Sequence, residues 1–376
     1  MRRSRIALIL WFLSIVAFVV VAVQGEVPFG LLILSTIVFA LLMGLYLMFS
    51  AERLSEALPQ FVRNSGEYGL PGFLFLLFAI LVLIMRLTNP VIVIVVAGAI
   101  LWVPVALWSR NAEALTPRQA IIGLAVLIIP LGVDVVLGAR PDTTSMVLRL
   151  GAFALPALLI LLTTREQKSR LNFYFAIAGL FIWYSVEFGA APDVDLPLGV
   201  HGLIGYLHLA LLVLLLYIVT LSQRLPDLGF TFSLQRSDWR EVLINFGLFA
   251  VIAIPLGLIT QFIKPSTQLP DPLFMIGQGL IIFLLIALPE EILFRGVIHR
   301  YLERVLRWAQ LPTLILSSVI FGASHLNNPP NVGYYFLLAT IAGFFYGRTY
   351  LRTGKIVPAA IVHLLVDWIW VVLFKG

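Results

Sequence analysis

Three short segments near the end of the chain place ionisable side chains inside otherwise apolar sequence: residues 289–296, 321–328 and 363–367. An ionisable group at membrane depth is costly, so such groups usually face a bundle interior or a water-filled cavity and serve a function. The side chains are carboxylates and imidazoles, which activate water or bind metal ions. Hydrolytic chemistry is therefore the first hypothesis for this part of the chain.

The first segment contains two adjacent glutamates. Glu291 and Arg295 are four residues apart, in the order that favours an ion pair along one helix face. Glu290 is turned about 100° from Glu291, so it points elsewhere. We expect Glu291 and Arg295 to support the structure and Glu290 to act as a general base, because desolvation makes a carboxylate a better proton acceptor. Taken alone, the segment is equally typical of a salt bridge at a helix end.

Histidines supply the other two segments. His325 by itself is typical of a packing residue, whereas His363 and Asp367 share one helix face at a spacing that suits metal ligands or a carboxylate that orients an imidazole. Together with Glu290 they could activate water and stabilise an oxyanion. They could equally bind zinc through Glu290, His325 and His363, with water in the open position. The residue types do not decide between these two chemistries.

Composition places the chain in a membrane. Hydrophobic residues make up 61% of the 376 and charged residues only 12%, whereas a soluble domain carries about a quarter charged residues. We predict an all-α fold, a polytopic transmembrane helical bundle. The absence of cysteine excludes disulfides, thiolate catalysis and S-acylation. The net charge of +6 is spread over short clusters between apolar runs, which indicates membrane lipids as partners and argues against nucleic acid.

About thirteen apolar segments are long enough to cross a bilayer. They are residues 6–23, 28–50, 71–87, 90–108, 120–139, 147–164, 171–190, 201–221, 242–262, 273–294, 312–327, 334–350 and 356–374. With the N-terminus in the cytoplasm and the C-terminus outside, the cytoplasmic loops contain all but five of the 25 lysines and arginines. The exceptions are Arg86, Arg140, Arg149, Lys264 and Lys375. This bias is the one that the positive-inside rule describes.

The polar stretch 222–241 divides the chain. We interpret it as a cytosolic linker between an N-terminal transmembrane region, residues 1–221 with about eight spans, and a catalytic membrane domain, residues 242–376. The first region contains Asp134 and Glu187 within its spans, and a transporter function would depend on such residues.

Taken together, the three segments resemble the CPBP family of intramembrane proteases, which includes the type II CAAX prenyl endopeptidases and their bacteriocin-processing relatives in prokaryotes. The motifs that carry the resemblance are Glu290-Glu291-xxx-Arg295, Phe321-xxx-His325 and His363-xxx-Asp367. The stretch from Gly343 to His363 is also similar to the family's link between its last two spans. The likeness covers about residues 240–371.

The resemblance implies a helical-bundle peptidase that opens toward the cytosol. It implies that Glu290 and His325 activate the attacking water and that His363 and position 367 stabilise the oxyanion. It favours a metal-free glutamate mechanism without a cofactor, and zinc remains the alternative. By the same resemblance, Phe321 and Asn328 are weaker candidates for substrate contact.

Position 367 departs from the prenyl endopeptidases, which carry asparagine there. An amide can donate to an oxyanion, whereas an ionised Asp367 would repel it. Asp367 must therefore be protonated, orient His363 or bind a metal.

The function expected from these features is endopeptidase cleavage of a membrane-associated polypeptide, such as a prenylated protein or a leader peptide, in a prokaryotic cell membrane. Two alternatives stay open: a non-catalytic immunity or scaffold protein of the same fold, and a transporter that uses the N-terminal spans. The spans as drawn also conflict with one shared site, because straight helices would place Glu290 and His325 at different depths. Either Pro289 breaks its helix and leaves 290–307 submerged, or the helix of 312–327 begins deeper.

Overall fold

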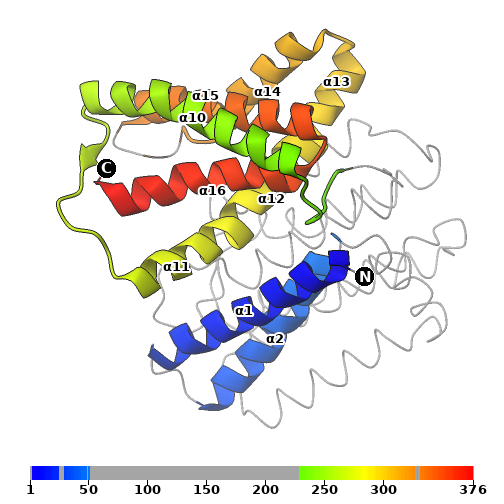
Figure 1. Cartoon of the computed structure of the whole chain (residues 1–376), viewed down its shortest axis with the longest axis vertical. Helices are drawn as coiled ribbons and strands as arrows, with labels where there is room; N and C mark the ends of the chain where they lie inside the picture. Colours follow the sequence, from blue (N-terminus) through cyan, green and yellow to red (C-terminus); the bar gives the residue numbers. More distant parts are fainter. Residues whose placement is uncertain are drawn as a thin grey trace, which may run out of the picture. The chain divides into compact units, whose positions relative to one another are not determined.

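The described part of the protein is mostly helical. The computed structural model describes residues 2–24, 29–48, 50, 228–326, 328 and 331–375. The chain divides into two compact units, Met1–Pro226 and Asp227–Gly376 (Figure 1). The predicted spans from 71 to 221, with Asp134 and Glu187, lie outside the described residues, so the proposed role of this region stays a prediction.

The first unit begins with two helices, α1 (Arg2–Gln24) and α2 (Phe29–Met48), where two spans are predicted. The rings of Phe18 and Phe39 stack with centroids 4.4 Å apart, and Trp11 Nε1 donates to the Ala40 carbonyl at 2.7 Å. These contacts join the two helices side by side.

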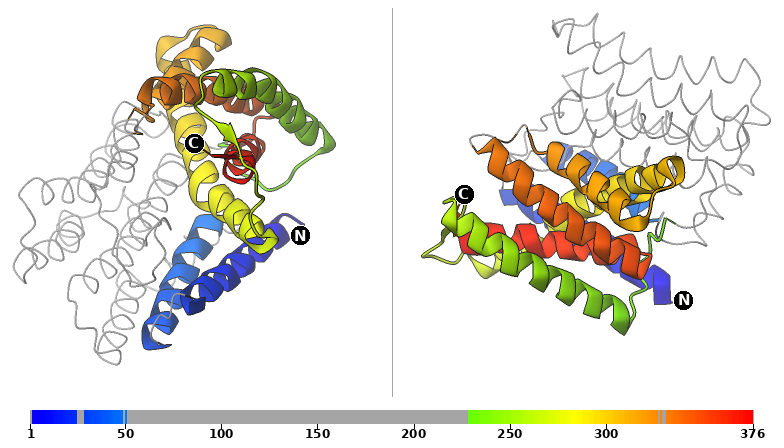
Figure 2. Two further views of the ribbon diagram at one scale, coloured as in Figure 1. Left: turned by 90° about the vertical axis from the view of Figure 1, so that its left-hand side faces the viewer. Right: turned by 90° about the horizontal axis from the view of Figure 1, so that it is seen from above.

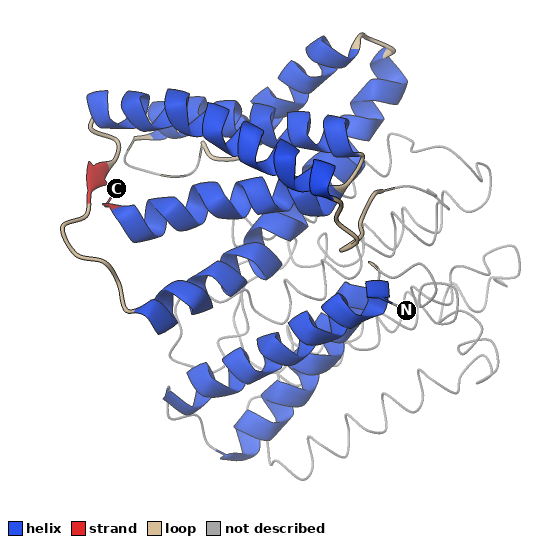
Figure 3. Ribbon diagram, in the orientation of Figure 1, coloured by secondary structure: helices blue, strands red, loops and turns tan. Residues whose placement is uncertain are grey.

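The second unit contains all three motif segments. Its elements in chain order are α10 (Arg236–Ile259), β1 (Lys264–Pro265), α11 (Pro272–Ile281), α12 (Leu288–Glu291), α13 (Arg300–Leu306), α14 (Gln310–Ala323), α15 (Val332–Thr353), α16 (Ile356–Leu373) and β2 (Phe374–Lys375). Helix α16 packs against α10, α11, α12 and α15, and the left view of Figure 2 looks nearly along it. The two-residue strands β1 and β2 pair antiparallel and are the only departure from an all-α fold among the described residues (Figure 3).

Three of the described helices are long and apolar enough to cross a membrane: Arg236–Ile259, Pro272–Arg304 and Ile356–Leu373. Helix α14 is apolar but only 14 residues long, and α15 is not among the three. The structure therefore supports an integral membrane protein of the all-α class. Thirteen spans and the orientation of the termini stay predictions.

The helix that carries Glu290 differs from the predicted span 273–294. It continues without a break from Pro272 to Arg304, so Pro289 does not end it. Two π-helical segments, Ile282–Ala287 and Ile292–His299, flank the proline. A proline cannot donate to the carbonyl four residues back, and its ring crowds that carbonyl. Wider turns, such as the one in which Leu288 N–H reaches the Phe283 carbonyl, accommodate it without a kink.

The helix continues beyond the predicted boundary inside the protein, not at its surface. Every residue of the segment Ile292–His299 is buried. Glu290 therefore lies deep within a long helix rather than at its cytosolic end, and this places it at a depth that the other motifs can reach. The predicted break at Pro289 is therefore wrong, and the continuous burial after Glu290 ends at His299, since Glu303 and Arg304 are exposed.

An extended segment, residues 228–235, closes one end of this unit. The Ile356 N–H donates to the Gly229 carbonyl at 3.0 Å. Lys355 Nζ lies 2.6 Å from Asp238 Oδ2 and donates to the Ser233 carbonyl at 3.0 Å. Residues 236–241 belong to α10 and not to a linker, because Asp238 caps this helix by accepting from the Gln235 N–H at 2.7 Å.

Replacement of Gly229 by alanine tests whether the contacts of residues 228–235 stabilise this unit. Gly229 has φ of +68°, and an added Cβ would run into the Gly354 carbonyl oxygen, so Gly229→Ala is expected to lower stability by about 1–2 kcal/mol or more. Gly247→Ala is the matched control, because a Cβ at Gly247 in α10 meets nothing within 4 Å; it is expected to raise stability by about 0.5–1 kcal/mol. Thermal unfolding in detergent measures both. Equal melting temperatures for the two variants would contradict a stabilising role of these contacts.

Candidate active site

A buried ion pair lies at the centre of the second unit. Arg295 Nη1 donates to Glu291 Oε1 at 2.9 Å, and Glu291 is 0% exposed. Arg295 Nη2 also donates to the Gly343 carbonyl of α15 at 2.7 Å. The pair predicted from the i, i+4 spacing is thus present, and it additionally fixes α15 to the helix that carries the glutamates.

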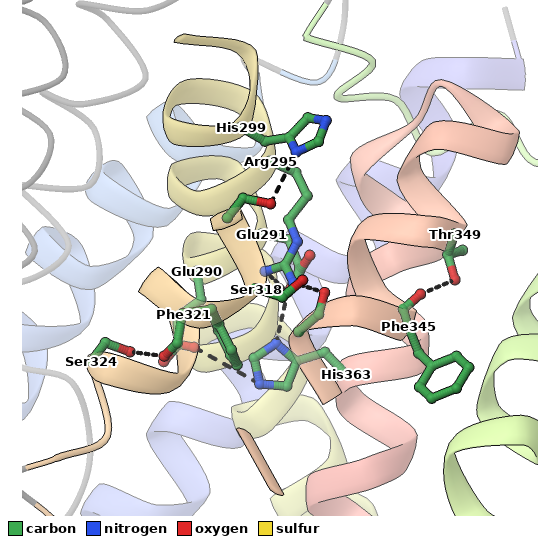
Figure 4. Close-up of polar contacts among 12 residues, drawn as sticks. Glu290, Glu291, Arg295, His299, Ser318, Phe321, Ser324, Phe345, Thr349 and His363 are labelled. Carbon is green, nitrogen blue, oxygen red and sulfur yellow. Dashed lines mark hydrogen bonds and ion pairs between the residues drawn. The ribbon is translucent and has the colours of Figure 1, made fainter. Parts of the chain in front are cut away.

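The imidazole of His363 lies between the two glutamates (Figure 4). Its Nδ1 is 3.1 Å from Glu291 Oε1, and its Nε2 is 3.9 Å from Glu290 Oε2. Because a carboxylate paired with a guanidinium only accepts hydrogen bonds, Nδ1 is the donor to Glu291. The two carboxylates diverge along their helix as predicted, and the ring spans the angle between them.

Asp367 lies one turn further along α16 than His363 and also approaches its ring. Its Oδ2 lies 3.3 Å from His363 Nε2. The side chains of Asp367 and Glu290 are 33% and 19% exposed, whereas those of His363 and Glu291 are 4% and 0% exposed. Two partly exposed carboxylate side chains therefore flank an imidazole that is itself enclosed.

His325 lies in the turn directly after α14. Its Nδ1 lies 3.0 Å from the Phe321 carbonyl and 2.9 Å from Ser324 Oγ. A carbonyl only accepts, so Nδ1 carries the hydrogen, and Nε2 of a neutral ring keeps its lone pair. The Phe321 ring contacts both imidazoles, with centroids 4.9 Å from His325 and 5.7 Å from His363.

The two candidates for substrate contact occupy different positions. Phe321 is 1% exposed and contacts Phe294, Tyr346 and both imidazoles, so its ring packs the site and presents almost no surface to a ligand. Asn328 is half-buried in the turn after α14, where its N–H donates to the His325 carbonyl at 3.2 Å.

One expectation about charge is wrong. Arg295 was expected among the cytoplasmic loop cations, but it is 3% exposed and paired inside the bundle. His299 on the same helix is also buried, at 2% exposed, and its Nδ1 lies 3.0 Å from Ser317 Oγ.

Sequence reasoning did not find two contacts of His363. Its bond to Glu291 was missed because that carboxylate was assigned to Arg295 alone. Its ring also stacks on Tyr346 of α15, with centroids 4.5 Å apart and planes 17° apart. No spacing within one helix could indicate this contact, since 17 residues and a turn separate the two side chains.

The donor set does not fit a resident metal ion. Among the described residues no group of three or more histidine, aspartate and glutamate side chains is arranged to hold a metal. Both nitrogens of His363 already face carboxylates. The zinc alternative through Glu290, His325 and His363 therefore has no assembled site among the described residues.

Fold and site define a membrane-embedded helical hydrolase domain built around paired carboxylates and imidazoles. A comparison with family models matches residues 272–369 to the family described as type II CAAX prenyl endopeptidase Rce1-like. This match supports a CPBP family intramembrane protease, and it confirms the resemblance drawn from the motifs. Neither curated proteins nor solved structures gave a match.

Loss of the Arg295 guanidinium should destabilise the domain strongly. Arg295→Met leaves Glu291 buried without its ion pair, and breaking a buried pair costs about 3–5 kcal/mol. The exposed Arg304 on the same helix provides the control Arg304→Met, which should unfold like the wild type. The double variant Glu291→Leu, Arg295→Met should recover part of the loss, because it removes both charges. Thermal unfolding in detergent measures the melting temperatures of the three variants. Equal melting temperatures for Arg295→Met and Arg304→Met would contradict the prediction.

Proposed function

We propose that the protein is an intramembrane endopeptidase that hydrolyses a peptide bond of a membrane-associated polypeptide by a glutamate mechanism. The observation that carries this proposal is the approach of Glu290 and Asp367 to His363, at 3.9 and 3.3 Å, inside a domain that matches the endopeptidase family. The substrate class suggested by that family is a prenylated or leader-bearing polypeptide.

Glu290 and His325 are proposed to activate the attacking water. Glu290 is the proposed proton acceptor because its Oε2 lies 3.9 Å from His363 Nε2 and its side chain is only partly buried. The lone pair on His325 Nε2 offers a second acceptor. Glu290 takes a proton from water as the oxygen attacks the carbonyl carbon, and the proton then passes to the departing amine as the carbon–nitrogen bond breaks.

His363 is proposed to stabilise the oxyanion. With hydrogens on both nitrogens, the ring donates to Glu291 through Nδ1 and faces Asp367 through Nε2, and its positive charge would stabilise the oxyanion. The 3.3 Å distance from Asp367 Oδ2 to Nε2 supports the second of the three roles considered for Asp367, which is to orient His363. An aspartate that holds the ring need not donate to the oxyanion itself.

The topology proposed for the whole chain has about thirteen spans, with the N-terminus in the cytoplasm and the C-terminus outside. The pairing of Lys264 with Lys375 is consistent with it, since the proposal assigns both residues to the same side of the membrane. The pairing of Lys355 with Asp238 likewise joins two residues that it assigns to the other side.

Single cysteines in this cysteine-free chain test the topology. Thr267→Cys and Gln310→Cys are both exposed positions on opposite faces of the proposed topology. A membrane-impermeant maleimide should label Thr267→Cys in intact cells and Gln310→Cys only after permeabilisation. The reverse pattern would invert the proposed orientation.

Substitution of Glu290 tests the mechanism. Glu290→Gln keeps the size of the side chain but removes the proton acceptor, and removal of a general base is expected to lower kcat by about 10²–10⁴-fold. The assay follows cleavage by the purified protein of a farnesylated peptide and its unmodified counterpart by mass spectrometry. Glu303→Gln, an exposed glutamate farther along the same helix, should retain full activity.

The same assay separates the alternatives. A metal-free mechanism retains its rate after treatment with 1,10-phenanthroline, whereas loss of activity that zinc restores would replace it with metal chemistry. Full activity of Glu290→Gln would remove the glutamate mechanism. No cleavage of either peptide by the wild type, combined with an intact biological role of Glu290→Gln, would favour the scaffold alternative.

A further inference from the structure

Five aromatic rings form a continuous row through the candidate active site. In spatial order they are Tyr346, His363, Phe321, His325 and Tyr335, which we call the ring row. Successive centroids lie 4.5, 5.7, 4.9 and 5.7 Å apart. Each imidazole of the site therefore lies between Phe321 and a tyrosine. Beyond the ring row, Tyr335 also contacts Phe262 and Trp370, and Tyr346 also contacts Phe321.

The contacts at the two ends differ from those in the middle. Tyr346 lies nearly parallel to His363, with planes 17° apart, and Tyr335 lies nearly parallel to His325, with planes 21° apart. The inner contacts of Phe321 with the two imidazoles are steep, at 85° and 51°. Each histidine is thus stacked face to face by a tyrosine.

Both tyrosines come from α15. They are eleven residues apart, which brings them within about 20° of three full helical turns and so onto the same face. One helix therefore carries both stacking partners. Arg295, on the helix of the glutamates, donates a hydrogen bond to the Gly343 carbonyl of this helix. Tyr346 also lies within cation–π distance of the Arg295 guanidinium, at 5.4 Å.

The hydrogen bonds of the two histidines leave one motion unrestrained. Bonds at the ring nitrogens lie near the plane of the imidazole, so they fix its direction but allow it to tilt about the bonded axis. This freedom is larger for His325, whose bonds to Phe321 and Ser324 are both at Nδ1. A parallel ring against the face of the imidazole restricts the tilt.

We propose that Tyr346 and Tyr335 are positioning residues for the peptidase reaction, and that they hold the planes of His363 and His325 by stacking. The inference rests on the proposed function, because it assigns the tyrosines a role through the two imidazoles. The aromatic ring is what matters at both positions, and the hydroxyl is not required for stacking.

The chain offers a matched neighbour for each tyrosine. Phe345 precedes Tyr346, is equally enclosed at 7% exposed, and turns its ring toward Phe249 of α10, away from the site. Tyr334 precedes Tyr335 and is 44% exposed. Leucine at these neighbours removes an aromatic ring from the same turn of the same helix without touching either imidazole.

The experiment compares kcat and KM for leucine and phenylalanine variants of the full-length protein, with the peptide that the wild type cleaves. Tyr346→Leu and Tyr335→Leu should each lower kcat by about 10–100-fold with little change in KM, because a misplaced catalytic group slows the chemical step. Tyr346→Phe and Tyr335→Phe should stay within about twofold of the wild type. Phe345→Leu and Tyr334→Leu should do the same.

A double variant tests whether Tyr346 acts through His363. If it does, adding Tyr346→Leu to His363→Ala lowers the residual rate no further, whereas independent effects multiply. Leucine variants with wild-type kcat, or phenylalanine variants as slow as the leucine ones, would overturn the inference and leave the proposed function intact. Full activity of Glu290→Gln would overturn the proposed function, and this inference with it.

Discussion

The second unit depends on the hydrogen bonds that the buried carboxylate of Glu291 accepts. This carboxylate accepts from Arg295 and from His363, and Arg295 in turn donates to the backbone of α15. One ionised group inside the bundle therefore joins the glutamate helix, α15 and α16. A buried charge is costly unless other groups compensate it. The three helices must therefore pack so that Arg295 and His363 both contact Glu291. His363 obtains its orientation from the same requirement.

The course of the glutamate helix follows from a second constraint. Pro289 stands immediately before the two glutamates, where an ordinary α-helix would kink. The π-helical segments on either side keep the helix continuous, and segments of this kind are frequent at functional sites. Glu290 thereby lies deep in the bundle, beside an imidazole from α16 and near one from the end of α14. A kink at this position would have moved the two glutamates relative to His363.

Two carboxylates that are adjacent in sequence serve different purposes because their surroundings differ. Glu291 is enclosed and ion-paired, so it supports the structure, whereas Glu290 keeps a fifth of its side-chain surface exposed. Asp367 is more exposed still. The two glutamates thus differ in exposure and in their access to a guanidinium, not in residue type, and this difference underlies the separate roles proposed for them.

Local spacing within single helices was enough to predict the Glu291–Arg295 pair, the shared face of His363 and Asp367, the apolar helices and the resemblance to intramembrane endopeptidases. These features depend on periodicity and composition, which the sequence states directly. The depth of Glu290, the burial of Arg295 and His299, and the stacking of Tyr346 on His363 depend on how separate helices pack. No periodicity within one helix specifies which face of another it will meet, so only the tertiary structure decided them.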